Sequence, residues 1–284
     1  MNKVLIFGVG LIGGSIALSL KKTGLTSSII GVGRNQDNLN DAIKLKIIDH
    51  TSQDLDKNIA EANIIIIATP VAQIPSILKI IQPYLSSHTI ITDVGSTKTD
   101  VIESAREILG QQYSQFIGGH PIAGSEKHGA MAAHSDLFKN KNVILTPDQH
   151  SSLRAREMIT TLWKNAGAKV SYMSHIDHDK IFSTISHLPH LLAFSLVDMI
   201  AQRSNANELL KYAASGFKDF TRIAASSPEM WKDIIFANKK FILEDIKYFE
   251  NQMELINDAI KHEDEKKILA LFKNASKTRN EWSQ

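Results

Sequence analysis

The chain has 284 residues, of which 43% are hydrophobic and 22% charged, a composition typical of a soluble globular protein long enough for two domains. Its 32 basic and 30 acidic residues give a net charge of +2, so no single-sign field favours nucleic acid or a membrane surface as a partner. It has no cysteine, which excludes a disulfide framework and a thiolate metal site and favours a cytoplasmic location. After the first strand and helix, we expect no apolar run that approaches the roughly 18 residues of a membrane span.

A glycine-rich turn stands near the start of the chain. The apolar, β-forming run 4–7 is followed by Gly8, Gly10 and Gly13 in GxGxxG spacing and then by a helical apolar pattern. The first glycine permits a tight turn, the second lets a pyrophosphate approach the backbone, and the third lets the helix pack against the strand. The spacing therefore predicts a dinucleotide site. Its cofactor-binding residues are predicted to be Gly8, Gly10, Leu11, Ile12 and Gly13.

A secretory signal peptide is the alternative interpretation of this segment, because Met-Asn-Lys precedes seventeen uncharged residues, Val4 to Leu20. The next residues are Lys21-Lys22-Thr23-Gly24, which do not form a small-residue cleavage site. A second strand-like run then begins at the distance that a βαβ unit requires, which favours the dinucleotide site.

Strand-like runs alternate with helical patterns through the first 172 residues, as in a parallel sheet covered on both faces. The strands are expected at 28–32, 63–68, 89–93, 115–118, 143–145 and 168–172, with helices at 73–82, 98–109 and 151–165. We therefore predict a Rossmann-type, mostly parallel α/β domain over residues 1–172. Ligands of such sheets bind beyond the carboxyl ends of the strands.

Two of these strand ends bear on the cofactor. NAD-binding sheets carry an acidic residue about 20 residues beyond the glycines, but this chain has Gly33 there, followed by Arg34. An arginine with no acid beside it can accommodate a 2′-phosphate, so the residues favour NADP over NAD, although Arg34 can also be a solvated surface residue. Thr69 and Pro70 end a run of isoleucines and are expected to pack beside the cofactor.

After Tyr172 long helical patterns replace the strands, which predicts an all-helical second domain over residues 173–284. From Trp231 to Ile260 apolar residues recur at steps of three and four, which indicates one long amphipathic helix or two in close succession. Packing inside the monomer would explain this pattern, but a helix of that length in a small domain more often packs on a second copy. We therefore predict a homodimer through this half.

The densest group of chemically useful residues is the stretch 118–126, Gly-Gly-His-Pro-Ile-Ala-Gly-Ser-Glu. Its glycines allow a loop backbone to pass close to a ligand, and His120 offers a base whose ordinary pKa is near neutrality. A dehydrogenase needs such a base to take the hydroxyl proton of its substrate. The alternative is a buried structural histidine, which the expected loop position disfavours.

Two further groups lie in the helical half. Ser186 to His190 places two imidazoles three residues apart, and Gly216 to Arg222 ends in an arginine that a carboxylate can hold. His187 with His190, or His175 with His178, has the spacing to chelate a metal from one helix face. No third ligand follows at helical spacing, and Pro189 interrupts the first pair, so we predict no metal.

Five motifs in the same order make the chain resemble the prephenate/arogenate (cyclohexadienyl) dehydrogenase family of tyrosine biosynthesis. They are Gly8 to Ser15, Asp93 to Lys98, the His120 segment, Ser186 to His190 and Gly216 to Arg222. The resemblance implies oxidative decarboxylation of prephenate to 4-hydroxyphenylpyruvate, or of arogenate to tyrosine, with NAD or NADP. It also implies that His120 accepts the ring hydroxyl proton and that Ser96 orients His120.

The resemblance further implies that Arg222 grips a substrate carboxylate in a bidentate fork, with no metal required. The other residues implied at the substrate site are Ser125, Glu126 and Asp219, the last two holding Arg222 in an ionic network, with His187, His190 and Trp231, the tryptophan reaching the site from the dimer partner. We expect neither a chorismate mutase domain before Lys3 nor an ACT domain after residue 284, so feedback by tyrosine would act at the active site.

Two other functions remain open. A 3-hydroxy acid dehydrogenase of similar architecture would use a lysine of the helical half for proton transfer, whereas the candidate base here lies in the first domain. A non-catalytic NADP(H)-binding sensor would need neither His120 nor Arg222. The residue types do not decide between prephenate and arogenate, because these substrates differ far from the carbon that loses the hydride.

Overall fold

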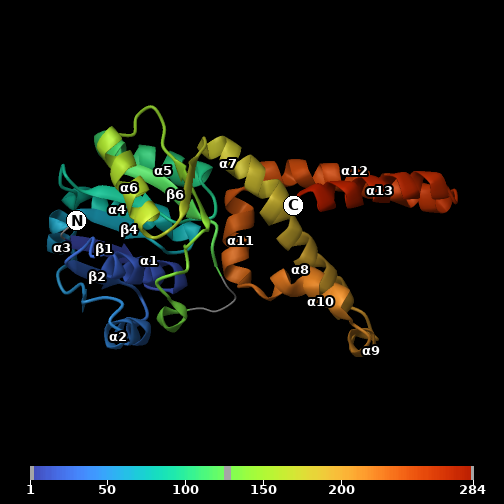
Figure 1. Cartoon of the computed structure of the whole chain (residues 1–284), viewed down its shortest axis with the longest axis horizontal. Coiled ribbons are helices and arrows are strands. Elements are labelled where there is room, and N and C mark those ends of the chain that lie inside the picture. Colours follow the sequence, from blue (N-terminus) through green and yellow to red (C-terminus); the bar gives the residue numbers. More distant parts are fainter. Residues whose placement is uncertain (1–2, 125–128, 283–284) are drawn as a thin grey trace. The chain divides into compact units, whose positions relative to one another are not determined.

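The structure is a computed structural model that describes residues 3–124 and 129–282. The chain forms two compact units, Met1–Asn238 and Lys239–Gln284. The first unit holds an eight-stranded sheet of order β3-β2-β1-β4-β5-β6-β7-β8, in which neighbouring strands are parallel except for the antiparallel pair β6 and β7 (Figure 1). The prediction of a mostly parallel sheet is confirmed.

The strands lie close to their predicted positions. They are β1 Lys3–Phe7, β2 Ser28–Val32, β3 His50–Thr51, β4 Ile64–Ile67, β5 Ile90–Asp93, β6 Phe116–Pro121, β7 Asn142–Thr146 and β8 Lys169–Tyr172. The two-residue edge strand β3 was not predicted, because it is too short to show a pattern of its own. Strand β6 is three residues longer than predicted at its carboxyl end, which bears on the site below.

The helices of the first unit connect these strands and then continue after β8. They are α1 Leu11–Lys22, α2 Gln36–Lys44, α3 Leu55–Glu61, α4 Ile74–Ile81, α5 Thr99–Leu109, α6 Leu153–Asn165, α7 His175–Phe182, α8 Leu188–Ala201, α9 Ala206–Lys211, α10 Ser215–Thr221 and α11 Pro228–Ala237. Short 3-10 turns lie at Val71–Gln73, Gln82–Tyr84, Gly110–Gln115, Ala130–Ala132 and Arg222–Ala225.

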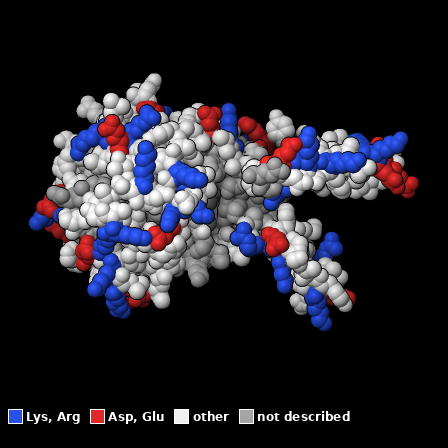
Figure 2. All heavy atoms as spheres, viewed as in Figure 1, with Lys and Arg blue, Asp and Glu red and all other residues white. Residues whose placement is uncertain are grey.

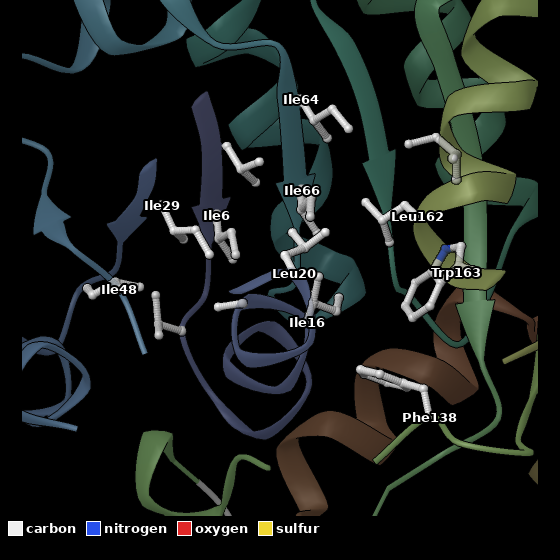
Figure 3. Close-up of a cluster of buried hydrophobic side chains, with 14 of the residues drawn as sticks. Ile6, Ile16, Leu20, Ile29, Ile48, Ile64, Ile66, Phe138, Leu162 and Trp163 are labelled. Carbon is white, nitrogen blue, oxygen red and sulfur yellow. The ribbon is translucent and has the colours of Figure 1, made fainter. Parts of the chain in front are cut away.

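Both faces of the sheet are buried, and the isoleucine run of β4 shows why. Alternate side chains of a strand point to opposite faces, so Ile64 and Ile66 join one core cluster and Ile65 and Ile67 the other, all four fully buried. Helices α1 and α6 cover the first face and α4 and α5 the second. Figure 3 shows the first cluster, in which Trp163 of α6 lies edge-on to Phe138.

Helices α7 and α8 are joined by a π-helical turn, Ser183–His187, into one continuous helix over His175–Ala201. This helix is long and apolar enough to cross a membrane by length and composition, with a mean hydropathy of 1.3. The expectation that no such stretch occurs was therefore wrong. The same composition suits a helix that packs on another protein surface, and only 11% of its apolar window is buried within this chain.

The second unit is a pair of helices, α12 Lys239–Lys261 and α13 Glu265–Trp282, which pack side by side (Figure 1). The turn between them contains Glu263 in the left-handed region at φ 54°. The pattern 231–260 is thus two helices in close succession, α11 and α12, separated at Asn238. The predicted domain boundary between residues 172 and 173 stays a prediction. The division of the chain into compact units instead places helices α7 to α11 in the same unit as the sheet.

The charged side chains are spread over the surface without a large patch of one sign on the face shown in Figure 2. Aspartates and glutamates are scattered there among the lysines and arginines. This distribution follows from the nearly balanced charges of the sequence.

Candidate active site

The glycine turn after β1 has the geometry that its spacing predicts. Gly8 has φ +89°, and a Cβ there would lie 2.5 Å from the Ala68 carbonyl oxygen. A Cβ on Gly13 would lie 2.1 Å from the Gly8 carbonyl oxygen, so only glycine lets α1 approach the turn this closely. At Gly10, in contrast, a Cβ would meet nothing within 4 Å. Gly8 and Gly13 therefore shape the turn, and Gly10 leaves space in front of the backbone.

The N-terminus of α1 fits the pyrophosphate of a dinucleotide. The helix begins at Leu11, and its cap residue Gly10 provides no side-chain hydrogen bond to the first-turn amides. Those amides carry the positive end of the helix dipole and have no acidic side chain in the first turn to neutralise them. An anionic phosphate oxygen is the partner that such a terminus accepts.

A cavity of about 550 Å³ opens beside this turn at the carboxyl edge of the sheet. It is lined by the glycine turn, the ends of β4, β5 and β6, and the start of α11. The predicted site residues that line it are Gly10, Leu11, Ile12, Thr69, Pro70, Ser96 and His120. The Thr69 hydroxyl is buried and has no partner among the described residues, so it is available to a bound group.

His120 lies on strand β6, whereas a loop position was expected. Strand β6 runs through Pro121, and its residue His120 pairs with Ile144 of the antiparallel strand β7. The half-buried imidazole has its Nδ1 2.8 Å from Nε2 of His178 and packs against the Phe182 ring at a centroid distance of 4.9 Å. A strand therefore fixes the backbone of the candidate base more firmly than a loop would.

His178 and Asp179 of α7 form the buried support of His120, a role that was not predicted for either residue. Nδ1 of His178 lies 2.8 Å from Oδ1 of Asp179, and both side chains are almost fully buried. The Asp179 carboxylate also accepts the backbone N–H groups of Lys98 and Thr99 at 2.8 and 2.7 Å. It thus binds the start of α5 to α7.

The pKa values of these groups follow from burial and their neighbours. Burial lowers the pKa of His120 well below its ordinary value, and the neighbouring His178 and Lys98 act in the same direction. Burial also lowers the pKa of His178. The pKa of Asp179 is lowered: burial raises it, but hydrogen bonds from His178 and Thr99 outweigh that effect. The arrangement at neutral pH is two neutral imidazoles backed by one carboxylate.

His187 connects the β5–α5 segment to the helices. Its Nδ1 accepts a hydrogen bond of 2.9 Å from the side-chain amide of Asn238, which also donates to the Asp179 carbonyl oxygen. Burial lowers the pKa of His187 to about 4, although a hydrogen bond with the Ser96 backbone acts to raise it. Protein groups therefore hold this ring, and His187 is 1% exposed. The predicted contact of His187 with substrate stays a prediction.

His190 and Trp231 form a stacked pair, with ring centroids 3.6 Å apart and planes at 20°. The indole is buried, and its Nε1 has no hydrogen-bond partner in the described part of the chain. Burial lowers the pKa of His190, a hydrogen bond to the Ser186 carbonyl oxygen raises it, and the positive charge of Arg222 lowers it. The turn Arg222–Ala225 packs against α8, the helix that carries His190. Trp231 thus stacks on a histidine of its own chain.

The remaining predicted site residues make few contacts with one another in the described structure. Arg34 is exposed after β2, and Asp219 and Arg222 are exposed and form no ion pair with each other in the described structure. Ser125 and Glu126 lie outside the described residues. Ser96 shares the cavity with His120, but the hydrogen bond seen at the imidazole is made with His178, so the role of Ser96 stays a prediction.

A buried ion pair lies behind the cavity. The Lys98 ammonium contacts the Asp93 carboxylate, and both side chains are fully buried. Asp93 also accepts the backbone N–H groups of Gly95 and Gly119, at 2.7 and 3.1 Å. These bonds hold together the ends of β5 and β6 that carry Ser96 and His120. Among residues 3–124 and 129–282, no three His, Asp or Glu side chains gather into a metal site.

A GxGxxG turn, an uncapped helix N-terminus and a histidine in the adjoining cavity define the class of nicotinamide-dependent dehydrogenases. Family models agree with this class. Residues 16–172 match the model "Prephenate dehydrogenase, nucleotide-binding domain", and residues 174–274 match "Prephenate dehydrogenase, dimerization domain". The chain therefore belongs to the prephenate dehydrogenase family.

Known proteins are similar over nearly the whole chain. Prephenate dehydrogenase of Bacillus subtilis (strain 168) is 40% identical over 281 residues, 98% of this chain and 76% of the relative. Prephenate dehydrogenase of Aquifex aeolicus, in a crystal structure with hydroxyphenyl propionate and NAD+, is 37% identical with a TM-score of 0.92, covering 99% of this chain and 98% of that one. Arogenate dehydrogenase of Synechocystis is 28% identical with a TM-score of 0.83, covering 99% of both chains. The chain is an oxidoreductase with a nicotinamide cofactor.

Proposed function

We propose that this chain converts prephenate to 4-hydroxyphenylpyruvate, carbon dioxide and reduced nicotinamide, with arogenate as the alternative substrate that would give tyrosine. The observation that carries the proposal is His120, which lines one cavity together with the glycine turn at Gly10 and Leu11. A base placed beside a dinucleotide site is what oxidation of a carbinol requires. The comparisons support the same substrate class through the names of the relatives.

The chain's residues hold the dinucleotide and the proton acceptor in fixed places. The amides at Leu11 and Ile12 would bind the pyrophosphate and Thr69 and Pro70 would pack beside it, an assignment supported by their position in the cavity lining at the N-terminus of α1. When bound, the oxidised nicotinamide supplies the acceptor for the hydride of the ring carbinol. His120 accepts the hydroxyl proton of the same carbon. Loss of carbon dioxide then makes the ring aromatic, so the protein needs to supply only the base and the geometry.

The substrate carboxylates are assigned to the region of His190 and Arg222. Arg222 is exposed, its charge acts on His190, and no ion-pair partner for it is found among the described residues. A guanidinium fork binds a carboxylate with two parallel hydrogen bonds. The buried indole N–H of Trp231, which has no hydrogen-bond partner among the described residues, is a further candidate donor in the same region. These donors suit a substrate with two carboxylates.

The preferred cofactor is proposed to be NADP. Arg34 is exposed directly after β2, and Gly33 stands where an acidic residue would otherwise bind the ribose hydroxyl. A Cβ at Gly33 would be in ordinary contact with Leu39, so crowding does not account for the missing acid. A cation without a neighbouring carboxylate favours the 2′-phosphate.

The assembly is proposed to be a homodimer, and its location the cytoplasm. Each unit exposes large apolar side chains, among them Ile181 and Ile185 of the long helix and Met253 and Phe272 of the helix pair. Apolar faces of this extent are covered by a protein partner more often than by water. The matched dimerization model spans both helical segments. Sedimentation of the chain at half its expected dimer mass would contradict this assembly.

A steady-state assay tests the proposed reaction. Prephenate and arogenate are each paired with NAD+ and NADP+, and the absorbance of reduced nicotinamide is followed. We expect turnover with prephenate and NADP+, and we expect His120→Asn to lower kcat by about 10² to 10⁴ with little change in KM. Folded protein that binds the dinucleotide but turns over none of the four pairs would refute the proposal and favour an NADP(H)-binding sensor.

A further inference from the structure

We infer that His178 is a positioning residue which, held by Asp179, fixes the tautomer of His120 so that the Nε2 atom of His120 is free to accept the substrate proton. The inference rests on the proposed function, in which His120 is the base. It goes beyond that function because it assigns the source of the base's correct protonation state. The three side chains come from β6 and α7, and the hydrogen bond between the two histidines joins residues 58 positions apart in the sequence.

The hydrogen bond between Asp179 and His178 can run in only one direction. Backbone N–H groups of Lys98 and Thr99 can only donate, so both Asp179 oxygens already act as acceptors. The same contacts stabilise the ionised carboxylate, whose pKa is lowered. An ionised carboxylate has no proton to give. Nδ1 of His178, 2.8 Å away, must therefore carry the hydrogen and donate it.

The direction of this bond determines where His120 carries its proton. A neutral imidazole has one N–H and one acceptor nitrogen, so His178 with its proton on Nδ1 presents an acceptor at Nε2. That Nε2 lies 2.8 Å from Nδ1 of His120, which must donate in turn. The single N–H of neutral His120 is thereby placed on Nδ1. Its Nε2 is left with a lone pair and is the atom able to take a proton.

The surroundings keep both histidines neutral until the reaction. His178 is fully buried, and the charges that face the pair are Asp179 on α7 and the Lys98–Asp93 ion pair of the β5–α5 segment. His187 of the π-helical turn also acts on His120. Burial and the Lys98 charge disfavour an imidazolium at either position, while Asp179 favours one at His178. The carboxylate can thus act on the charge that His120 acquires with the substrate proton only through the hydrogen bond between the two imidazoles.

The packing fixes the geometry of this chain of hydrogen bonds. The Phe182 ring lies 4.5 Å from the His178 ring centre and 4.9 Å from that of His120, so it restrains both imidazoles. Asn238 donates to the Asp179 carbonyl oxygen, and Asp179 binds the first amides of α5. The arrangement resembles the carboxylate and imidazole of a hydrolase triad, with a second imidazole as the base.

Nuclear magnetic resonance of histidine-labelled protein tests the tautomer without any turnover. The ring nitrogen and carbon shifts of His120, assigned by their loss in His120→Asn, are expected to report a proton on Nδ1 near pH 7.5. A proton on Nε2 in the wild-type protein would overturn the inference. This result does not depend on the substrate, so it separates failure of the inference from failure of the proposed function.

Kinetics of His178 variants provide the second test. In His178→Phe, which keeps an aromatic ring beside Phe182, we expect kcat to fall by at least about 10²-fold, since a wrongly held imidazole in a hydrolase triad loses about 10⁴. The KM for substrate and the Kd for dinucleotide are expected to stay within about threefold. His178→Gln, whose amide oxygen can accept from His120, should recover part of the loss, and both variants should shift the pH profile of kcat/KM.

His175→Asn provides the matched control. His175 is a half-buried histidine on the same helix that makes no hydrogen bond to His120 or Asp179 in the described structure, and its replacement is expected to leave kcat and the pH profile unchanged. Wild-type kcat and an unshifted pH profile in His178→Phe would overturn the inference. If that variant does not fold, the wild-type tautomer still decides the question.

Discussion

The substitutions Gly13→Ala and Gly10→Ala are expected to distinguish two roles of glycine in the turn after β1. Gly13 permits close packing of α1, and Gly10 leaves space for the dinucleotide. A Cβ at Gly13 would lie 2.1 Å from the Gly8 carbonyl oxygen, and neither backbone can move away without shifting α1 from the sheet. We expect Gly13→Ala to lower the free energy of unfolding by about 1 to 3 kcal/mol, the usual cost of overpacking. Gly10 has φ −101° and ψ −153°, which alanine adopts readily, and open space at its Cβ position. Gly10→Ala should therefore stay within about 0.5 kcal/mol of the wild-type stability.

The methyl group of Gly10→Ala stands instead where the pyrophosphate approaches the backbone. We expect the Kd of the dinucleotide to rise about tenfold, equivalent to about 1.4 kcal/mol. At a dinucleotide concentration of about 100 times the wild-type Kd, the wild-type protein gains about 2.7 kcal/mol of stability and the variant only about 1.4 kcal/mol. Urea unfolding with and without NADP+ measures both quantities in one series.

Either of two results would refute this reasoning. One is a loss of stability in Gly10→Ala as large as that of Gly13→Ala when no dinucleotide is present. The other is a gain of stability in Gly10→Ala equal to that of the wild-type protein when the dinucleotide is added. The two variants control for each other, because they introduce the same methyl group three residues apart.

Three further predictions concern other parts of the first unit. Arg222→Ala should raise the KM for prephenate strongly, by an amount equivalent to about 2 to 5 kcal/mol if the bound pair is desolvated, and an unchanged KM would remove Arg222 from the carboxylate site. Lys98→Met leaves the fully buried Asp93 carboxylate unpaired and should cost about 3 to 5 kcal/mol in urea unfolding, much of which a second change, Asp93→Asn, should restore. Hydrogen bonds from Tyr113 and Arg106 outweigh burial and lower the pKa of Asp148 to about 2 from its ordinary 3.8. The stability it supplies should be complete above pH 3.8 and be lost as the pH falls through about 2, and Asp148→Asn should lack this dependence in urea midpoints measured against pH.

The sheet was predictable because each of its central strands is a short apolar run between turn signals. Ile64–Ile67 is buried on both faces, so it reads as a continuous apolar segment rather than an alternating one. The edge strand His50–Thr51 has no such pattern. The carboxyl end of β6 was misjudged because the glycines at 118 and 119 suggested a loop. In the fold, a Cβ at Gly119 would lie 2.9 Å from the Asp93 carbonyl oxygen, so this glycine permits close packing of two strands.

The cofactor turn could be located from the sequence, since all its parts lie within one short segment. The residues that support His120, His178 and Asp179, could not be located in this way. The spacing of His175 and His178, three residues apart on one helix, indicates only a candidate metal pair, because helical spacing says nothing of the strand on which α7 packs. Asp179, directly after His178, was a signal of a carboxylate–imidazole pair, but its partner His120 is set by topology alone.

This topology places the candidate base and its support, His178, on opposite sides of the predicted domain boundary at residues 172 and 173. The parallel strands β1, β4, β5 and β6 end at one edge of the sheet, which brings Gly8, Thr69, Ser96 and His120 together. His178 on α7 is the hydrogen-bond acceptor that fixes the tautomer of His120. The backbone amides that bind Asp179 belong to Lys98 and Thr99, on the N-terminal side of the boundary. The tautomer of the base therefore depends on the docking of α7 against β6 and the start of α5. A change that loosens this docking should impair proton transfer even when the dinucleotide turn is intact.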